Sequence, residues 1–164
     1  ATSEIYTLSL HDALPIYPLV YINTAKGFDL LDSETRNLGQ YLENGGFVII
    51  EFDVQSFPGL KRFLPGNARL KPVPDDHPIY SICFPIEDTI WRDKMQGGLG
   101  NRSGEFIIGP YLTGIWIDND LVGVYSEKGL GNTWSGYYTS GQTDNTIVRL
   151  GVNFVAYAHA RSNE

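Results

Sequence analysis

The feature that most constrains the fold is a strand–helix–strand pattern in the first third of the chain. Residues 17–23 (YPLVYIN) and 47–52 (FVIIEF) are short apolar runs rich in β-branched and aromatic side chains, which is typical of buried strands. The helix expected between them carries an apolar stripe at helical spacing, formed by Leu38, Tyr41 and Leu42. Two apolar strands joined through a helix predict parallel strands in a sheet that helices cover on both faces.

Residues with clear conformational preferences mark the two ends of this helix. Asp32 is the expected N-cap, and Glu34 follows in the first turn, where the helix dipole favours negative charge. The sequence Asn44-Gly45-Gly46 is the expected stop, because glycine tolerates the left-handed conformation found just after many helices. The second strand starts directly after these glycines, so the connection is short.

Further strands are expected downstream. Residues 69–73 predict an edge strand ended by prolines, and residues 79–84 are weakly strand-like. Residues 112–118 and 121–126 predict a β-hairpin, with Asp118-Asn119-Asp120 as its turn. These segments extend the sheet beyond the first strand–helix–strand unit.

The chain is expected to close on a helix over residues 146–158. Its apolar face comprises Ile147, Leu150, Phe154 and Tyr157. Gly151 would permit close packing of this helix on the sheet, and the Gly-rich stretches at 87–104 and 129–144 are expected to be loops. The prediction is therefore an α/β fold with a mostly parallel sheet, helices on both faces and a β-hairpin.

Composition and charge narrow the classes of protein. The 164 residues fit one domain, and a hydrophobic content of 42% is that of a globular chain. A net charge of −7 without a basic stripe argues against binding to nucleic acid or to anionic membranes. The one cysteine, Cys83, excludes an internal disulfide and any cysteine-based zinc cluster, and its apolar neighbours predict a small core residue.

Residues 1–16 are set apart from the rest. Their sequence resembles the translation of a widely used sequencing-library adapter, from which Ser3 is the one departure in the matching stretch. We interpret residues 1–16 as an adapter-derived artefact and residues 17–160 as a single α/β domain that is incomplete at its N-terminus.

Candidate binding residues follow the first two strands. Ligands of open α/β sheets bind beyond the carboxyl ends of the strands, which nominates Asn23, Thr24, Lys26, Glu51 and Asp53. In a continuing strand, Glu51 and Asp53 would point to the same side and could bind a divalent cation or act as acid and base. The alternative, which we favour, is a solvated strand end with ordinary loop carboxylates.

His77 is a second candidate. It follows Asp75-Asp76, and an acid pair beside an imidazole suits a metal ion or a proton shuttle. We favour the structural alternative, in which these side chains cap the backbone of a turn. Outside residues 1–16 the only other histidine is His159, and the turn after 47–52 holds no serine or cysteine nucleophile. No catalytic residue, metal site or cofactor is therefore predicted.

Trp134 is the third candidate. With Tyr137 and Tyr138 it lies in the 129–144 segment, where aromatic faces could stack on a sugar ring or pack the segment onto the body of the domain. The sequence leaves these two alternatives open.

Several segments, taken in order, resemble the bacterial domain-of-unknown-function family 4159. They are YPLVYI, GFDLLDSETRNLGQYLENGGFVIIEFD, FPGLKRFLPGNARLKPVPDDHPIY, IWIDNDLVGVYSEKGLGNTW and LGVNFVAYA. The resemblance implies a flavodoxin-like fold similar to the class I glutamine-amidotransferase superfamily, with a strand and a helix missing upstream. It also implies a bacterial protein that is exported or associated with the envelope.

The chain departs from the family where polar groups are common. Residues 23–27 (NTAKG) stand where members show a His-Gly pair, and residues 51–55 (EFDVQ) replace a segment with two acids and Asn-Tyr-Gly. We therefore expect a non-catalytic module that binds a polar small molecule, a protein partner or a neighbouring domain. The alternative is a metal-assisted hydrolase or carbohydrate-active enzyme that uses the carboxylates at the strand ends.

Overall fold

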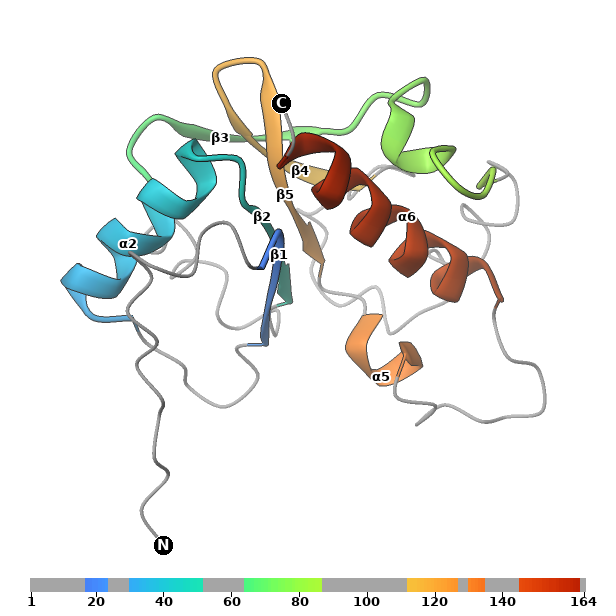
Figure 1. The fold of residues 1–164 in the computed structure, drawn as a ribbon, viewed down its shortest axis with the longest axis horizontal. Coiled ribbons are helices and arrows are strands. Elements are labelled where there is room, and N and C mark those ends of the chain that lie inside the picture. Colours follow the sequence, from blue (N-terminus) through green and yellow to red (C-terminus); the bar gives the residue numbers. More distant parts are fainter. Residues whose placement is uncertain are drawn as a thin grey trace, which may run out of the picture.

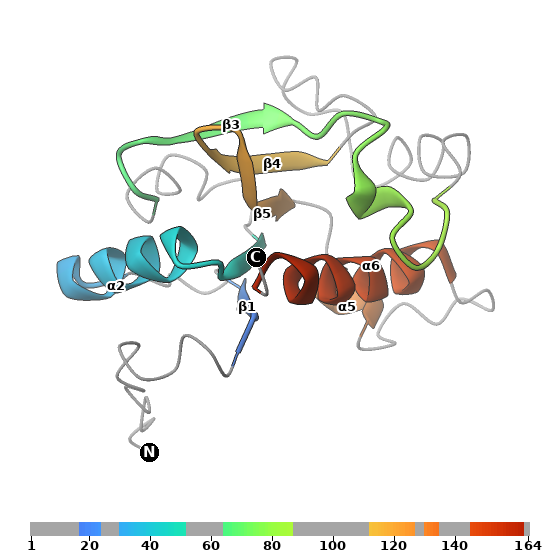
Figure 2. The ribbon, with the colours of Figure 1, turned by 45° about the horizontal axis from the view of Figure 1, so that its top comes forward.

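The domain is built around one five-stranded sheet. The computed structural model describes residues 17–23, 30–51, 64–86, 112–126, 130–134 and 145–162. The sheet has the order β1-β2-β5-β4-β3. Its strands are Leu19–Asn23 (β1), Phe47–Glu51 (β2), Ala68–Pro72 (β3), Thr113–Ile117 (β4) and Asp120–Ser126 (β5). Figures 1 and 2 show helix α2 (Asp32–Glu43) and helix α6 (Asn145–Arg161) on opposite sides of this sheet.

The sheet is mixed. Strands β1, β2 and β5 are parallel neighbours, whereas β4 pairs antiparallel with both β5 and β3. The α/β class, the hairpin and the edge strand are confirmed, but the mostly parallel, flavodoxin-like arrangement is not. The reason is the short turn at Asp118 and Asn119, which can join only antiparallel neighbours, so that β4 runs opposite to β5 and to β3 on its other side.

Apolar side chains fill both faces of the central strand β2. Val48 and Ile50 pack in one core cluster with Leu38, Tyr41 and Leu42 of α2. Phe47 and Ile49 pack in a second cluster, whose α6 members are Leu150, Phe154 and Ala158. Successive strand residues point to opposite faces, so a continuous apolar run such as β2 needs cover on both sides. The predicted helices on both faces are confirmed.

The start of α2 differs from the prediction, whereas its end agrees. Leu31 is the residue that precedes the helix, and Asp32 is its first helical residue rather than its cap. The Leu31 backbone N–H donates instead to the Glu34 carboxylate at 2.8 Å, so an acid one turn further on does the capping. Gly45, with φ of 94°, has the left-handed conformation expected after the helix.

Three local expectations are wrong. Strand β1 lies at the edge of the described sheet and is half-buried to exposed rather than buried. Residues 79–84 form no strand, because the short 3₁₀ helix Pro78–Tyr80 (η2) starts this segment and bends follow it. Cys83 is exposed rather than in the core, because it lies on one of those bends.

Helix α6 covers one face of the sheet and contacts the short helix Leu130–Trp134 (α5). The predicted apolar face of α6 is confirmed, but part of the predicted 129–144 loop is helical. Gly151 provides close packing against Trp134 rather than the sheet, since a Cβ there would lie 3.0 Å from the indole nitrogen. None of the helices in the described part of the chain combines the length and apolar character needed to cross a membrane.

Candidate functional site

Three polar residues lie in one row where the three parallel strands end. Asn23 of β1 is in register with Glu51 of β2, and Glu51 is in register with Ser126 of β5. The structure therefore brings together the predicted residues Asn23 and Glu51. Sequence analysis missed Ser126, because only the pairing of the hairpin strand β5 beside β2 places it in this row.

Glu51 is buried, with 6% of its surface exposed. Its Oε2 atom accepts a hydrogen bond from the Tyr21 hydroxyl and a second from the Gly131 backbone N–H at 3.0 Å. The favoured expectation of a solvated strand end is therefore wrong for Glu51. A buried carboxylate held by two donors from other segments is a fixed acceptor, since its position is set by β1 and α5 as well as by its own strand.

Tyr21 connects Glu51 to the surface. Its hydroxyl donates to Glu51 and accepts a hydrogen bond from Asn23 Nδ2 at 3.3 Å, while 38% of the residue is exposed. Burial, followed by the hydrogen bond to the Glu51 carboxylate and its negative charge, raises the pKa of Tyr21 to about 12. The phenol therefore keeps its proton at physiological pH. We call Tyr21, Asn23, Glu51, Ser126 and Gly131 the carboxyl-edge cluster.

Trp134 adjoins this cluster. Its indole N–H donates to the Ile147 carbonyl at 2.9 Å, and its ring packs edge-on against Tyr21 at 5.9 Å and Phe154 at 6.3 Å between centroids. These contacts are those of the packing alternative, in which the ring joins α5 to α6 and supports Tyr21. A role of Trp134 in ligand binding stays a prediction.

His77 does not join the carboxyl-edge cluster. It precedes η2, where its Nδ1 atom accepts the Ile79 backbone N–H at 3.2 Å, and its ring contacts Trp116 and Tyr157. Burial, partly offset by the charges of Asp76 and Asp120, lowers the pKa of His77. The imidazole thus caps a backbone turn, as the structural alternative predicted. The neighbouring Asp75 and Asp76 are exposed.

The remaining predicted residues, Thr24, Lys26 and Asp53, lie outside the described residues. The hypothesis of a Glu51–Asp53 pair therefore stays a prediction. Within the described part of the chain, no three His, Cys, Asp or Glu side chains are grouped so that they could hold a metal ion.

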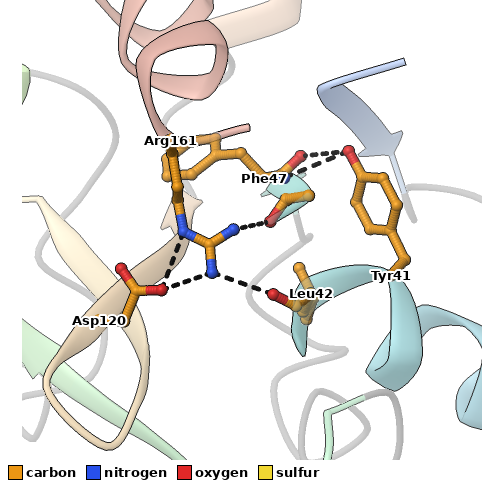
Figure 3. A network of polar contacts seen from close by, with 6 residues as sticks. Tyr41, Leu42, Phe47, Asp120 and Arg161 are labelled. Atoms are coloured by element: carbon orange, nitrogen blue, oxygen red, sulfur yellow. Dashed lines mark hydrogen bonds and ion pairs between the residues drawn. The ribbon is translucent and has the colours of Figure 1, made fainter. Parts of the chain in front are cut away.

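A second polar network ties the opposite ends of the same strands, and sequence analysis missed it. Arg161, at the end of α6, donates to the carbonyls of Gly46 at 2.5 Å and Leu42 at 3.0 Å and forms an ion pair with Asp120 (Figure 3). The Tyr41 hydroxyl exchanges hydrogen bonds with the backbone of Phe47. The sequence signal that could have identified Arg161 was a basic residue in the last turn of a helix that contains no acidic residue. We call these residues the amino-end network.

The model of one family, described as "Domain of unknown function (DUF4159)", matches residues 2–159, which is almost the whole chain. The match begins within residues 1–16, and the adapter origin of that segment stays a prediction. No curated protein matches the chain.

Proposed function

The chain belongs to the DUF4159 family, and we propose that it is a non-catalytic binding module that takes a hydroxyl-rich small molecule at the carboxyl-edge cluster. The single observation that carries the proposal is Glu51, a buried carboxylate at the carboxyl end of a central parallel strand that holds Tyr21 in place. This end of the strands is where open α/β sheets bind ligands.

The hydrogen bonds of the cluster have a direction that favours one class of ligand. The Tyr21 hydroxyl donates its proton to Glu51, so its lone pairs face Asn23 and the exposed side. Asn23 is exposed, and its side chain contains both an amide donor, which already bonds to Tyr21, and a carbonyl acceptor. Neighbouring hydroxyl groups can each donate and accept, so a molecule rich in hydroxyls matches this arrangement.

A positioning role for Glu51 suits binding better than catalysis. The carboxylate is nearly inaccessible and one of its oxygen atoms already accepts two hydrogen bonds, from Tyr21 and Gly131. A general acid or base has to reach the proton that it transfers. In this proposal Tyr21 and Asn23 contact the ligand, while Glu51 orients them.

An NMR titration with glucose, N-acetylglucosamine and myo-inositol tests the proposal. The amide of Gly131 donates to Glu51 and that of Ser126 lies in the adjacent strand, so both report on the cluster. We expect saturable shifts of these two amides with at least one probe. In Tyr21→Phe the affinity should fall about tenfold, the loss expected for one hydrogen bond.

Asp120→Asn is the matched control, because it changes a polar residue at the other end of β5 and should leave the affinity unchanged. Shifts that avoid Gly131 and Ser126, or that persist at full affinity in Tyr21→Phe, would contradict the proposal. Shifts of the same amides with Mg²⁺ alone would favour the metal-assisted alternative.

A further inference from the structure

Two side chains make hydrogen bonds to the backbone of the segment between β3 and residue 86, one from inside the segment and one from α6. At its start, His77 caps η2 through the hydrogen bond from the Ile79 N–H to its Nδ1 atom. Further on, the Asn153 side chain of α6 exchanges hydrogen bonds with the Phe84 backbone at 2.8 and 2.9 Å. Of these two side chains, His77 is the one that titrates.

Helix η2 carries side chains that close this side of the core. Ile79 is fully buried, and the Tyr80 hydroxyl accepts the Leu112 backbone N–H at 3.0 Å and lies 3.4 Å from the Val73 carbonyl. Tyr80 therefore bridges the end of β3 and the start of β4. Loss of the cap would loosen these contacts together, because both side chains belong to the same short turn.

The cap depends on the protonation state of the imidazole. Nδ1 can accept the Ile79 N–H only with a free lone pair, so the bound form is the neutral ring with its proton on Nε2. A second proton would make Nδ1 a donor that faces another donor. We propose that His77 is a proton-sensitive latch, whose protonation in mildly acidic conditions releases residues 78–86 from α6 and the sheet.

The surroundings of the ring set the direction of the effect. Trp116 of β4 and Tyr157 of α6 enclose it, with centroid distances of 5.8 and 5.2 Å, and the charged groups that act on it are Asp76 of its own turn and Asp120 of β5. The pKa of His77 is lowered because burial outweighs the attraction of these two carboxylates. The released form therefore binds the proton more tightly. The His77 cap is therefore fully formed above the ordinary histidine pKa of about 6.5 and is lost as the pH falls below it.

Amide hydrogen exchange at about pH 7.5 and about pH 5.5, both above the carboxylate range, tests the latch. After correction for intrinsic exchange rates, protection of the Ile79 and Leu112 amides should fall by up to about tenfold per pH unit below about 6.5. The amides of β2 should change much less. His77→Asn places an amide oxygen near the position of Nδ1 and does not titrate, so it should remove the pH dependence.

His159→Asn is the matched control, because it replaces an exposed histidine of α6 and should keep the wild-type pH dependence. The same loss of protection in His77→Asn as in the wild type would overturn the latch. A ¹⁵N spectrum showing the His77 proton on Nδ1 at neutral pH would overturn it as well, and this measurement needs no variant.

Discussion

The two ends of the parallel strands use polar groups in opposite ways. At the amino end, the buried Arg161 guanidinium donates to main-chain carbonyls, and the buried Tyr41 hydroxyl bonds to the backbone of Phe47. At the carboxyl end, Asn23, Tyr21 and Glu51 are linked by hydrogen bonds between side chains, and two of the three are exposed. Both ends are rich in hydrogen bonds, but the exposed side chain at the amino end, Asp120, is held by the Arg161 guanidinium, whereas the exposed side chains at the carboxyl end, Tyr21 and Asn23, belong to a network of side chains.

The difference suits a division in which the amino end stabilises the fold and the carboxyl end takes the ligand proposed above. The positions of main-chain carbonyls are set by the fold and not by the side chains. A network whose acceptors are main-chain carbonyls therefore stabilises the fold and leaves few groups for a ligand. A network of side chains costs stability to arrange and leaves donors and acceptors accessible. The contrast supports the placement of the proposed ligand at the carboxyl edge.

The largest effect is expected from Arg161→Met. The variant keeps an apolar stem but removes the donors to Leu42 and Gly46, and two main-chain carbonyls without donors cost about 3 kcal/mol of unfolding free energy. Asp120→Asn, which affects only the exposed side of the ion pair, should cost about 0.5 kcal/mol. Urea unfolding measures both, and equal losses in the two variants would remove the distinction between main-chain anchoring and surface charge.

Replacing one glycine by alanine at each end of the strands compares how tightly the two ends are packed. A Cβ on Gly46 would lie 2.3 Å from the Tyr41 ring, and a Cβ on Gly131 would lie 2.2 Å from the Tyr21 hydroxyl. Tyr41 is fully enclosed, whereas Tyr21 is partly exposed and can turn outward. Gly46→Ala should therefore cost about 2 kcal/mol and Gly131→Ala about 1 kcal/mol or less.

Thermal unfolding of the two glycine variants measures these costs. Gly131→Ala should still weaken ligand binding, because Tyr21 leaves Glu51 when it turns outward. A larger stability loss for Gly131→Ala than for Gly46→Ala would mean that the carboxyl end is the more rigid of the two.

Much of the fold could be predicted from local patterns. The helix exit at Asn44-Gly45-Gly46, the hairpin turn and the apolar face of α6 depend on residues close in sequence, and each was predicted. The mixed sheet was not, because strand order depends on long-range pairing. The sequence shows that β4 and β5 form a hairpin, but not that β5 pairs with β2, nor that β4 lies between β5 and β3 and runs opposite to both.

The site was predictable only in part for the same reason. Asn23 and Glu51 were nominated because they end apolar strands, which is a local signal. Tyr21 was assigned to a buried strand, and its hydrogen bond to Glu51 depends on the pairing of β1 with β2. Arg161 was missed because two of its acceptors are backbone carbonyls and its carboxylate partner, Asp120, is distant in the sequence.

The smallest expected effect is a difference between the two ends in the stability that is lost at alkaline pH. Burial raises the pKa of both Tyr21 and Tyr41 to about 12. The unfolded chain loses these protons near pH 10, so the stability that each group contributes is complete below about pH 10 and is lost as the pH rises toward 12. Replacement by phenylalanine removes the group that titrates, so each variant should lose less stability between about pH 8 and about pH 11 than the wild type.

Tyr41→Phe should show the larger change of the two, because its hydroxyl is buried against the backbone, whereas water screens the partly exposed Tyr21. At neutral pH the lost hydrogen bonds of Tyr41 should cost about 1 kcal/mol. Urea unfolding at the two pH values gives the comparison, and lysine titration cancels because it is common to all the chains. An equal alkaline loss in wild type and Tyr41→Phe would show that the amino end is open enough for Tyr41 to ionise as freely as in the unfolded chain.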